Sequence, residues 1–218
     1  MLAAQQQEPE QAIRAVAGER QAPVIVPDPP DRYPELKNRT LSMVGTVYRS
    51  NAAQALAALE VLRDGGAVVP APVDLLAEAL VKTVLPGRGE RLDDLLLDGA
   101  HTPESIAHVV ATLEETPVVA ILGVVSGKDL AGIVRELGRA VSRVIVSRPG
   151  TFKPGDPQVV FEAVVAAGIP AELEPEPLQA LNRARQVNAT LAEGRRSILV
   201  TGSFYMVAEV RREALACH

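Results

Sequence analysis

From residue 92 onward, short apolar runs alternate with amphipathic stretches. The apolar runs have the length and composition of buried strands, and they cover residues 95–97, 118–124, 143–147, 171–173 and 197–201. The amphipathic stretches have the period of helices, and they cover residues 103–115, 128–141, 156–167, 177–193 and 204–216. Strands that are apolar throughout need cover on both faces, and their alternation with helices is typical of parallel pairing. The pattern therefore predicts an α/β fold, a Rossmann-like and mostly parallel sheet with helices on both faces.

The N-terminal part of the chain has a different pattern, in which helical stretches flank a proline-rich segment. Five prolines fall within residues 21–40, where they remove backbone donors and disfavour helix in the preceding residue. Inside this segment the run "APVIVP", residues 22–27, predicts one short strand. Helices are predicted at residues 8–19, 50–66 and 72–84. We expect the second helix to begin at Ser50 as its N-cap and to end at the pair Gly65-Gly66.

The stretch "LPGRGE", residues 85–90, separates these two patterns. A proline and two glycines in a short charged segment are typical of a linker. We therefore predict a small, mainly helical region over residues 1–85, a hinge linker over residues 86–91 and the α/β domain over residues 92–218.

Composition narrows the class of protein. The net charge of -5 and the absence of a polybasic stretch disfavour nucleic-acid binding and attachment to a membrane surface. No run of apolar residues is long enough for a transmembrane helix, and the N-terminus lacks the layout of a signal peptide. The single cysteine, Cys217, excludes a disulfide framework within the chain. We expect a cytoplasmic protein that binds neither nucleic acid nor membrane.

The first predicted strand of the α/β domain ends in the sequence "LLLDGAHTPES". Asp98 and His101 follow the carboxyl end of that strand, which is where ligands bind in sheets of this kind. A simpler interpretation is that Asp98 accepts backbone N–H groups in the turn, while Thr102 and Pro103 start the next helix. The residues alone leave both interpretations open.

Three further stretches offer groups for an anion. In "GVVSGKD", residues 123–129, Lys128 follows a strand, but the spacing is one residue short of a Walker A loop and Asp129 replaces its Ser or Thr. Ser203 follows the last strand, where it either caps a helix or lies beside free N–H groups that bind an anion. Arg88 in the linker either grips a phosphate or is solvated. No Cys and His spacing indicates a metal site.

Taken in order, the motifs "LLLDGAHTPES", "GVVSGKDL" and "SILVTGSFYMVAEV" resemble the C-terminal domain of folylpolyglutamate synthase/dihydrofolate synthase, in the Mur ligase superfamily. The linker "LPGRGE" is similar to that family's Pro-Gly-Arg-Phe-Glu hinge, and "SNAAQALAALEVL" is similar to the end of its central ATPase domain. Two residues depart from the family pattern, since Thr102 replaces an Asn and Gly89 replaces the Phe of the hinge. The family's front half, with its phosphate loop and magnesium ligands, has no counterpart in residues 1–80. The resemblance therefore implies that residues 1–85 are a remnant of the central ATPase domain.

The resemblance also implies a reaction, in which ATP with Mg²⁺ phosphorylates the carboxylate of a folate or dihydropteroate and L-glutamate attacks the acyl phosphate. Magnesium ligands would be absent from this chain. The site residues that it implies fall into three groups. These are Asn51, Arg88 and Asp98 for ATP binding, His101 and Lys128 as catalytic residues facing the reacting phosphate, and Ser203 near the incoming glutamate.

Three hypotheses remain at this point. The chain is part of such a ligase, inactive alone because its phosphate-loop half lies on a separate chain. Alternatively, it is a non-catalytic module that binds a nucleotide or a folate. In the third hypothesis it is a structural α/β domain.

Overall fold

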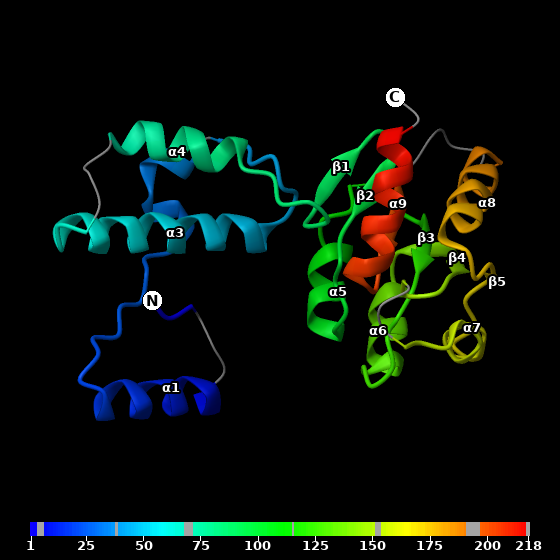
Figure 1. Cartoon of the computed structure of the whole chain (residues 1–218), viewed down its shortest axis with the longest axis horizontal. Helices are drawn as coiled ribbons and strands as arrows, with labels where there is room; N and C mark the ends of the chain where they lie inside the picture. Colours follow the sequence, from blue (N-terminus) through cyan, green and yellow to red (C-terminus); the bar gives the residue numbers. More distant parts are fainter. Residues whose placement is uncertain are drawn as a thin grey trace. The chain divides into compact units, whose positions relative to one another are not determined.

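The computed structural model describes residues 1–218 except 4–6, 38, 68–71, 115, 151–153, 191–196 and 217–218. The chain divides into two compact units (Figure 1). The N-terminal unit comprises Met1–Ser42 and Thr46–Thr83, and the α/β unit comprises Met43–Gly45 and Val84–His218.

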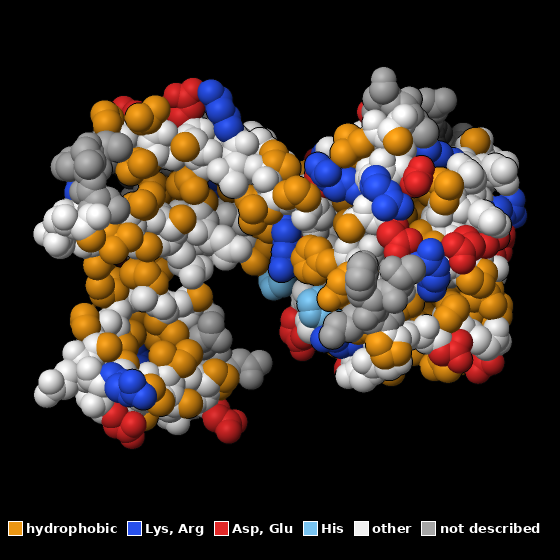
Figure 2. All heavy atoms as spheres, viewed as in Figure 1, with side chains coloured by type: hydrophobic (Ala, Val, Ile, Leu, Met, Phe, Trp, Pro, Cys, Tyr) orange, Lys and Arg blue, Asp and Glu red, His pale blue; other side chains and the backbone are white. Residues whose placement is uncertain are grey.

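The regular secondary structure described in the N-terminal unit consists of helices. Its helices are α1 (Gln7–Glu19), the 3-10 helix η1 (Pro30–Arg32), α2 (Pro34–Lys37), α3 (Thr46–Asp64) and α4 (Val73–Lys82). Leu36, Tyr48, Leu56 and Ala77 form a small buried core in this unit. Helix α1 buries none of its residues, and Val16 on it is 56% exposed. Figure 2 accordingly shows hydrophobic side chains gathered on the surface of this unit.

Two expectations for the N-terminal unit are wrong. Residues 22–27 form no strand, because this unit offers no other strand among its described residues to pair with them. Ser50 is not an N-cap, since α3 already begins at Thr46 and the Ser50 hydroxyl lies one turn inside the helix, 3.5 Å from the Thr46 carbonyl oxygen. Buried Tyr48 lies in the added turn, so packing extends the helix past the residue that favours a cap.

The predicted end of α3 at the glycine pair is confirmed. Gly66 has a φ of +70°, and its N–H donates to the Arg63 carbonyl at 2.9 Å. The N–H of Ala67 donates to the Leu62 carbonyl at 2.8 Å. These two hydrogen bonds form a Schellman motif, which satisfies the last carbonyls of the helix and needs the left-handed conformation that glycine adopts without strain.

The α/β unit is built on a six-stranded sheet. Its strands are β1 (Glu90–Leu92), β2 (Leu95–Leu97), β3 (Val118–Leu122), β4 (Val141–Val146), β5 (Ala171–Leu173) and β6 (Ile198–Thr201). They lie in the order β1-β2-β6-β3-β4-β5, and all neighbouring pairs are parallel except β1 with β2. The predicted mostly parallel sheet is confirmed. Strand β1 was not predicted, because two of its three residues are charged and it has no apolar alternation.

Helices cover both faces of this sheet, as predicted. They are α5 (Pro103–Val110), α6 (Leu130–Leu137), α7 (Pro157–Ala166), α8 (Pro177–Ala189) and α9 (Phe204–Ala216). Leu96 packs into a core with Ile106, Ile133 and other residues of α5, α6 and α7. Its neighbours Leu95 and Leu97 pack on the opposite face, against α8 and α9. Because successive strand residues point to opposite faces, one apolar run supplies both cores.

Most helix boundaries differ from the prediction by a few residues. Helix α6 begins at Leu130 rather than at Lys128, because Asp129 is its N-cap and accepts the Gly132 N–H at 2.9 Å. Lys128 therefore lies in the loop before the helix. The last predicted residues of α8 lie outside the described residues. None of the described helices has the length and apolar character needed to cross a bilayer.

Glu172 on β5 links neighbouring elements through two arginines. Its carboxylate accepts hydrogen bonds from Arg143 on β4 at 2.9 Å and from Arg183 on α8 at 3.1 Å. The hydrogen bond from Arg183, helped by the charges of both arginines, lowers the pKa of Glu172 from its ordinary value, although partial burial opposes the shift. Since the folded-state pKa is the lower one, the stabilisation is present above the unfolded-state pKa and is lost as the pH falls through the folded-state pKa.

We expect Glu172→Gln to lower the free energy of unfolding by up to about 1 kcal/mol at neutral pH, as for a partly exposed ion pair. In acid, below the lowered pKa of Glu172, the variant and the parent should be equally stable. Urea unfolding at the two pH values measures this difference. An equal loss at both pH values would show that the carboxylate charge contributes nothing.

Candidate functional site

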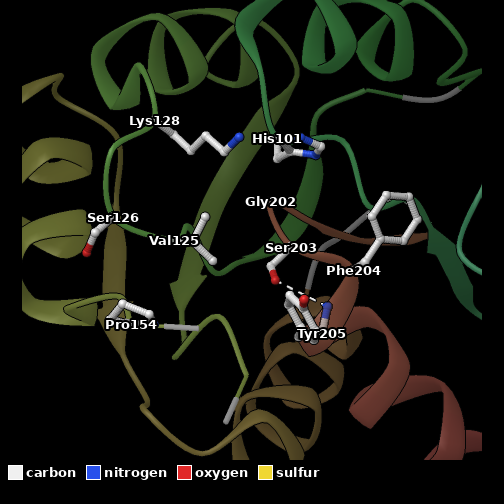
Figure 3. A pocket seen from close by; sticks show the side chains of 9 residues that line it. All are labelled: His101, Val125, Ser126, Lys128, Pro154, Gly202, Ser203, Phe204 and Tyr205. Atoms are coloured by element: carbon white, nitrogen blue, oxygen red, sulfur yellow. Dashed lines mark hydrogen bonds between the residues drawn. The ribbon is translucent and has the colours of Figure 1, made fainter. Parts of the chain in front are cut away.

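Polar side chains from three strand ends meet at one edge of the sheet. They surround a cavity of about 460 Å³ beyond the carboxyl ends of β2, β3 and β6 (Figure 3). The cavity is lined by His101, Val125, Ser126, Lys128, Pro154, Gly202, Ser203, Phe204 and Tyr205. This edge is where the sequence predicted a ligand site, and it brings three of the predicted residues together, namely His101, Lys128 and Ser203.

Asp98 holds the turn after β2 and the hinge in one arrangement. Its side chain is buried, and one carboxylate oxygen accepts the Ala100 N–H at 2.9 Å. The other oxygen accepts the N–H of Gly89, in the hinge, at 2.8 Å. The simpler interpretation of Asp98, a carboxylate that satisfies backbone N–H groups, is therefore confirmed. These bonds leave the predicted contact with a nucleotide untested.

His101 lies partly exposed in the wall of the cavity. Its Nδ1 atom is 3.0 Å from the Gly99 carbonyl oxygen. A carbonyl oxygen only accepts hydrogen bonds, so Nδ1 carries the proton and donates it. In the neutral ring Nε2 is then an acceptor, and in the protonated ring it becomes a donor. This orientation suits a group that binds or exchanges a proton with a ligand.

The start of α5 is capped as the sequence indicated. Thr102 accepts the Ser105 N–H through its hydroxyl at 3.3 Å, and the Ser105 hydroxyl accepts the Thr102 N–H at 3.0 Å. Pro103 occupies the first helical turn, where its missing N–H costs nothing. Thr and Asn are both good N-cap residues, so the cap is kept although Thr102 departs from the family pattern.

Lys128 presents a cationic group to the same cavity. Its side chain is exposed, and Figure 3 shows it extending in the direction of His101. Within the described part of the chain, its ammonium has no carboxylate partner. The carboxylate of neighbouring Asp129 is occupied by the helix cap, where it accepts the Gly132 N–H. This hydrogen bond directs the Asp129 carboxylate to the start of α6, and the described residues show no ion pair between it and Lys128.

Ser203 is buried at the start of α9 and serves as its cap. Its hydroxyl donates to the Pro149 carbonyl at 2.6 Å and accepts the Tyr205 N–H at 3.2 Å. The N-cap interpretation is confirmed, and the single hydroxyl proton is already used. What Ser203 can still offer a ligand is a lone pair. Its predicted position near the glutamate stays a prediction.

Gly202 lets the ends of β6 and β3 approach each other closely. Its φ is +100°, and a Cβ atom on it would lie 2.5 Å from the Gly123 carbonyl oxygen. Both the backbone conformation and the contact exclude a larger residue. The cavity floor thus depends on the glycine that precedes Ser203.

Arg88 lies in the hinge of the α/β unit, with its guanidinium exposed. The guanidinium carbon is 4.4 Å from the centre of the Phe204 ring, a cation–π contact. Phe204 also contacts His101 edge-on, with ring centres 6.4 Å apart. Sequence reasoning missed Phe204, and the available signal was a phenylalanine directly after the Gly-Ser pair in a chain with only three phenylalanines.

Glu90 holds the hinge turn in place, and sequence reasoning also missed this residue. Its carboxylate accepts the Gly87 N–H at 2.8 Å. Both of its oxygens lie 2.9 Å from Nε of Arg211, on α9. The side chain of Glu90 is only 8% exposed and that of Arg211 is 30% exposed, so the carboxylate of this ion pair is nearly buried. The hinge turn around Arg88 is therefore held by Glu90 on one strand and by Asp98 after the next.

Arg148, after β4, braces the same end of the unit. Its guanidinium forms ion pairs with Glu176 at 3.1 Å and with Glu209, on α9, at 3.0 Å. Hydrogen bonds to Glu176 and then to Glu209 raise the pKa of Arg148, and the hydrogen bond from Arg148 lowers the pKa of Glu176. These ion pairs hold Arg148 in place. The carbonyl oxygen of the next residue, Pro149, accepts the hydrogen bond from the Ser203 hydroxyl.

Asn51 belongs to the N-terminal unit, where it is exposed on α3. Its predicted nucleotide contact stays a prediction. As for metals, the described residues contain no group of three or more His, Cys, Asp and Glu side chains that could hold an ion. The described residues therefore do not fit a magnesium site.

Known proteins of similar sequence include the dihydrofolate synthetase of Saccharomyces cerevisiae. It is 28% identical to this chain over 158 residues, which cover 61% of this chain and 36% of the yeast protein. The chain thus spans about a third of the length of that curated relative.

Several solved structures share the fold. A folylpolyglutamate synthase of Mycobacterium tuberculosis complexed with ADP and AMPPCP matches with a TM-score of 0.83 at 20% identity, over 97% of this chain and 54% of that protein. A folylpolyglutamate synthase of Thermotoga maritima matches with a TM-score of 0.71 at 21% identity, over 98% and 53%. The bifunctional folylpolyglutamate synthase/dihydrofolate synthase of Yersinia pestis, complexed with AMPPNP and a Mn ion, matches with a TM-score of 0.73 at 24% identity, over 93% and 50%.

The match to a protein family runs from the hinge to the start of α9. Residues 87–204, more than half of the chain, match the family described as "Mur ligase, glutamate ligase domain". This range holds Arg88, Asp98, His101, Lys128 and Ser203. The chain therefore belongs to the Mur ligase family, through its glutamate ligase domain.

Proposed function

We propose that this chain supplies the C-terminal half of an ATP-dependent ligase site that adds L-glutamate to a folate or a dihydropteroate. The observation that carries the proposal is the cavity at the carboxyl edge of the sheet, where the ring of His101 and the ammonium of Lys128 converge. Among the described residues this ammonium forms no ion pair. Similarity to a dihydrofolate synthetase and to folylpolyglutamate synthases supports the choice of substrates.

The groups in the cavity suit a reaction that develops charge on phosphate oxygens. In the proposed reaction the substrate carboxylate becomes an acyl phosphate, which the glutamate amine then attacks. Lys128 would offset the negative charge of that phosphate, and His101, with protons on both ring nitrogens, would donate a hydrogen bond from Nε2 to it. The acyl transfer needs little covalent help from the protein, so positioned charges supply most of the catalysis.

Nucleotide binding would involve the hinge and the turn after β2. Arg88 would neutralise phosphate charge, Asp98 would accept hydrogen bonds from the nucleotide, and Asn51 would contribute from the N-terminal unit. The nucleotides named for the similar structures of Mycobacterium tuberculosis and Yersinia pestis support ATP as the co-substrate. Ser203, through its remaining lone pair, would lie near the ammonium of the incoming glutamate.

The site would be incomplete without a second half. The residues of this chain include no Gly-x-x-x-x-Gly-Lys-Ser/Thr loop, and such a loop supplies most of the affinity for the phosphates of ATP. We propose that the catalytic site forms when a phosphate-loop half, on a separate chain or an upstream segment, joins this one. A cytoplasmic location is part of the same proposal.

The experiment compares the purified chain with the same chain fused to the phosphate-loop half of a related synthase. We expect the chain alone to release no ADP in response to a folate and glutamate, because its phosphate cradle is missing. The fusion should ligate glutamate, and Lys128→Met in the fusion should slow this on the order of a hundredfold, as for loss of one charged transition-state contact.

Two results would contradict the proposal. One is glutamate-dependent ADP release by the chain alone, in preparations free of host ligase. The other is a folded fusion that binds ATP and folate but ligates as fast with Lys128→Met as without it.

A further inference from the structure

The ring of Phe204 lies in the wall between two cavities of the α/β unit. On one side is the cavity that holds His101 and Lys128. On the other is a cavity of about 470 Å³ between the hinge and α9, lined on the hinge side by Pro86 and Gly87. Phe204 belongs to neither of the two hydrophobic cores of the sheet. Its position therefore serves something other than filling a core.

The backbone around Phe204 is shaped to receive its ring. A Cβ atom on Gly99 would lie 2.4 to 2.5 Å from three ring atoms of Phe204. Gly87, with a φ of +70°, brings the hinge to the same ring, since its Cβ would lie 3.6 Å from a ring carbon. The ring thus rests directly on the bare backbone between Asp98 and Ala100, where any other residue at position 99 would displace it.

Two groups of the proposed site touch this ring from different segments. The Arg88 guanidinium lies over its face, 4.4 Å from the centre. The His101 ring meets its edge, with an angle of 67° between the two ring planes. Figure 3 shows Phe204 on the His101 side of the cavity. One rigid aromatic ring therefore limits the positions of a hinge cation and of an imidazole 13 residues further along the chain.

We infer that Phe204 is a positioning residue, which holds Arg88 and His101 in one arrangement for a phosphate-bearing ligand. The inference rests on the proposed function, because it takes Arg88 and His101 as the groups that meet the ligand. A planar guanidinium stacked on a ring loses fewer conformations when it binds a phosphate than a freely moving one. Stacking of the guanidinium requires an aromatic face. Tyrosine at position 204 should therefore keep the arrangement of Arg88 and His101, and leucine should not.

The first measurement needs no ligand. In the full chain, NMR relaxation gives the order parameter of the Nε–H bond of each arginine on the picosecond to nanosecond scale. Arg212, whose side chain is 75% exposed, is the internal standard for a mobile arginine. We expect Arg88 to be more ordered than Arg212 in the parent and in Phe204→Tyr. In Phe204→Leu, Arg88 should become as mobile as Arg212.

The second measurement is the affinity for ADP, followed by the shifts of the Arg88 and His101 signals. Phe204→Leu should weaken binding about threefold to fivefold, the size of one cation–π contact, and Phe204→Tyr should stay within about twofold of the parent. The double variant Arg88→Ala with Phe204→Leu should bind ADP no more weakly than Arg88→Ala alone. ADP lacks the reacting phosphate assigned to His101, so Phe204 affects ADP affinity through Arg88.

Phe161→Leu is the matched control. Phe161, on α7, packs against the hydrophobic core that the sheet forms with α5, α6 and α7. Its replacement should lower the melting temperature while leaving Arg88 order and ADP affinity unchanged. Unchanged Arg88 order in a folded Phe204→Leu chain would overturn the inference, and so would additive losses in the double variant. If ADP moves no signal in the parent chain, the affinities are measured in the fusion with the phosphate-loop half, and no shift of the Arg88 signal there would contradict the proposed function. The order parameters decide in either case whether Phe204 positions Arg88.

Discussion

Glu90→Ala is expected to lower the free energy of unfolding of the α/β unit by about 3 kcal/mol, the cost of breaking a nearly buried ion pair. The change leaves Nε of Arg211 without the two oxygens that lie 2.9 Å from it. It also removes the acceptor of the Gly87 N–H, a buried backbone donor. Both losses fall on the hinge turn that carries Arg88.

Glu90→Gln separates the two contributions. Its amide oxygen can still accept the Gly87 N–H, but the side chain no longer offsets the charge of Arg211. We expect it to cost about half as much as Glu90→Ala. In a unit of this size, 3 kcal/mol corresponds to a fall of about 10 °C in the melting temperature.

Glu114→Gln is the control for this series. Glu114 pairs with Arg91 at 3.3 Å, but its side chain is 81% exposed, so its replacement should change stability by less than about 0.5 kcal/mol. The measurement is urea unfolding, followed by a signal from the α/β unit. If Glu90→Ala were no more destabilising than Glu114→Gln, the hinge would not depend on the Glu90–Arg211 pair.

The sheet and the edge that holds the site were predictable because both follow from local patterns. Apolar runs such as "LLL" at residues 95–97 report burial on both faces, and their alternation with helices fixes parallel pairing. The location of His101 and Lys128 then follows from the rule that ligands bind at the carboxyl ends of such strands. Neither inference needs a contact between distant residues.

The features that were missed depend on such distant contacts. Strand β1 is held by pairing with β2 and by Arg211, which lies 121 residues after Glu90. Phe204 matters because Gly87 and Gly99 leave room for its ring, which no single motif reveals. Asp98 is a similar case. The structure uses one of its carboxylate oxygens for the Ala100 N–H and the other for the Gly89 N–H, and an asparagine has only one such oxygen.

Polar residues at the carboxyl edge of the sheet can have a structural role and a functional role at once. Ser203 caps α9 and lines the cavity, and Asp129 caps α6 directly after Lys128, which lines the same cavity. Helix starts at the carboxyl edge of the sheet need polar caps for their free N–H groups, and the same edge is open to ligands. A polar residue there is therefore expected to have a structural partner whether or not it has a functional one. Only a measurement that separates stability from activity distinguishes the two.

The His101→Ala variant is expected to lower activity without lowering stability. In the fusion with a phosphate-loop half, we expect the ligation rate to fall on the order of a hundredfold, because a hydrogen bond to a developing charge is lost. Folding should be affected little, since the ring is partly exposed and its structural contacts are one hydrogen bond to Gly99 and one ring edge of Phe204.

His108→Ala is the matched control for this prediction, because His108 is exposed on α5 and lines no part of the described cavity. It should leave both rate and melting temperature near those of the parent fusion. The measurements are the melting temperature and the rate of glutamate ligation at saturating ATP. A fall in rate without a fall in melting temperature requires that the Nε2 atom of His101 meets the reacting groups. If His101→Ala ligated within about threefold of the parent, less than 1 kcal/mol would be at stake, and the ring would serve only the turn after β2.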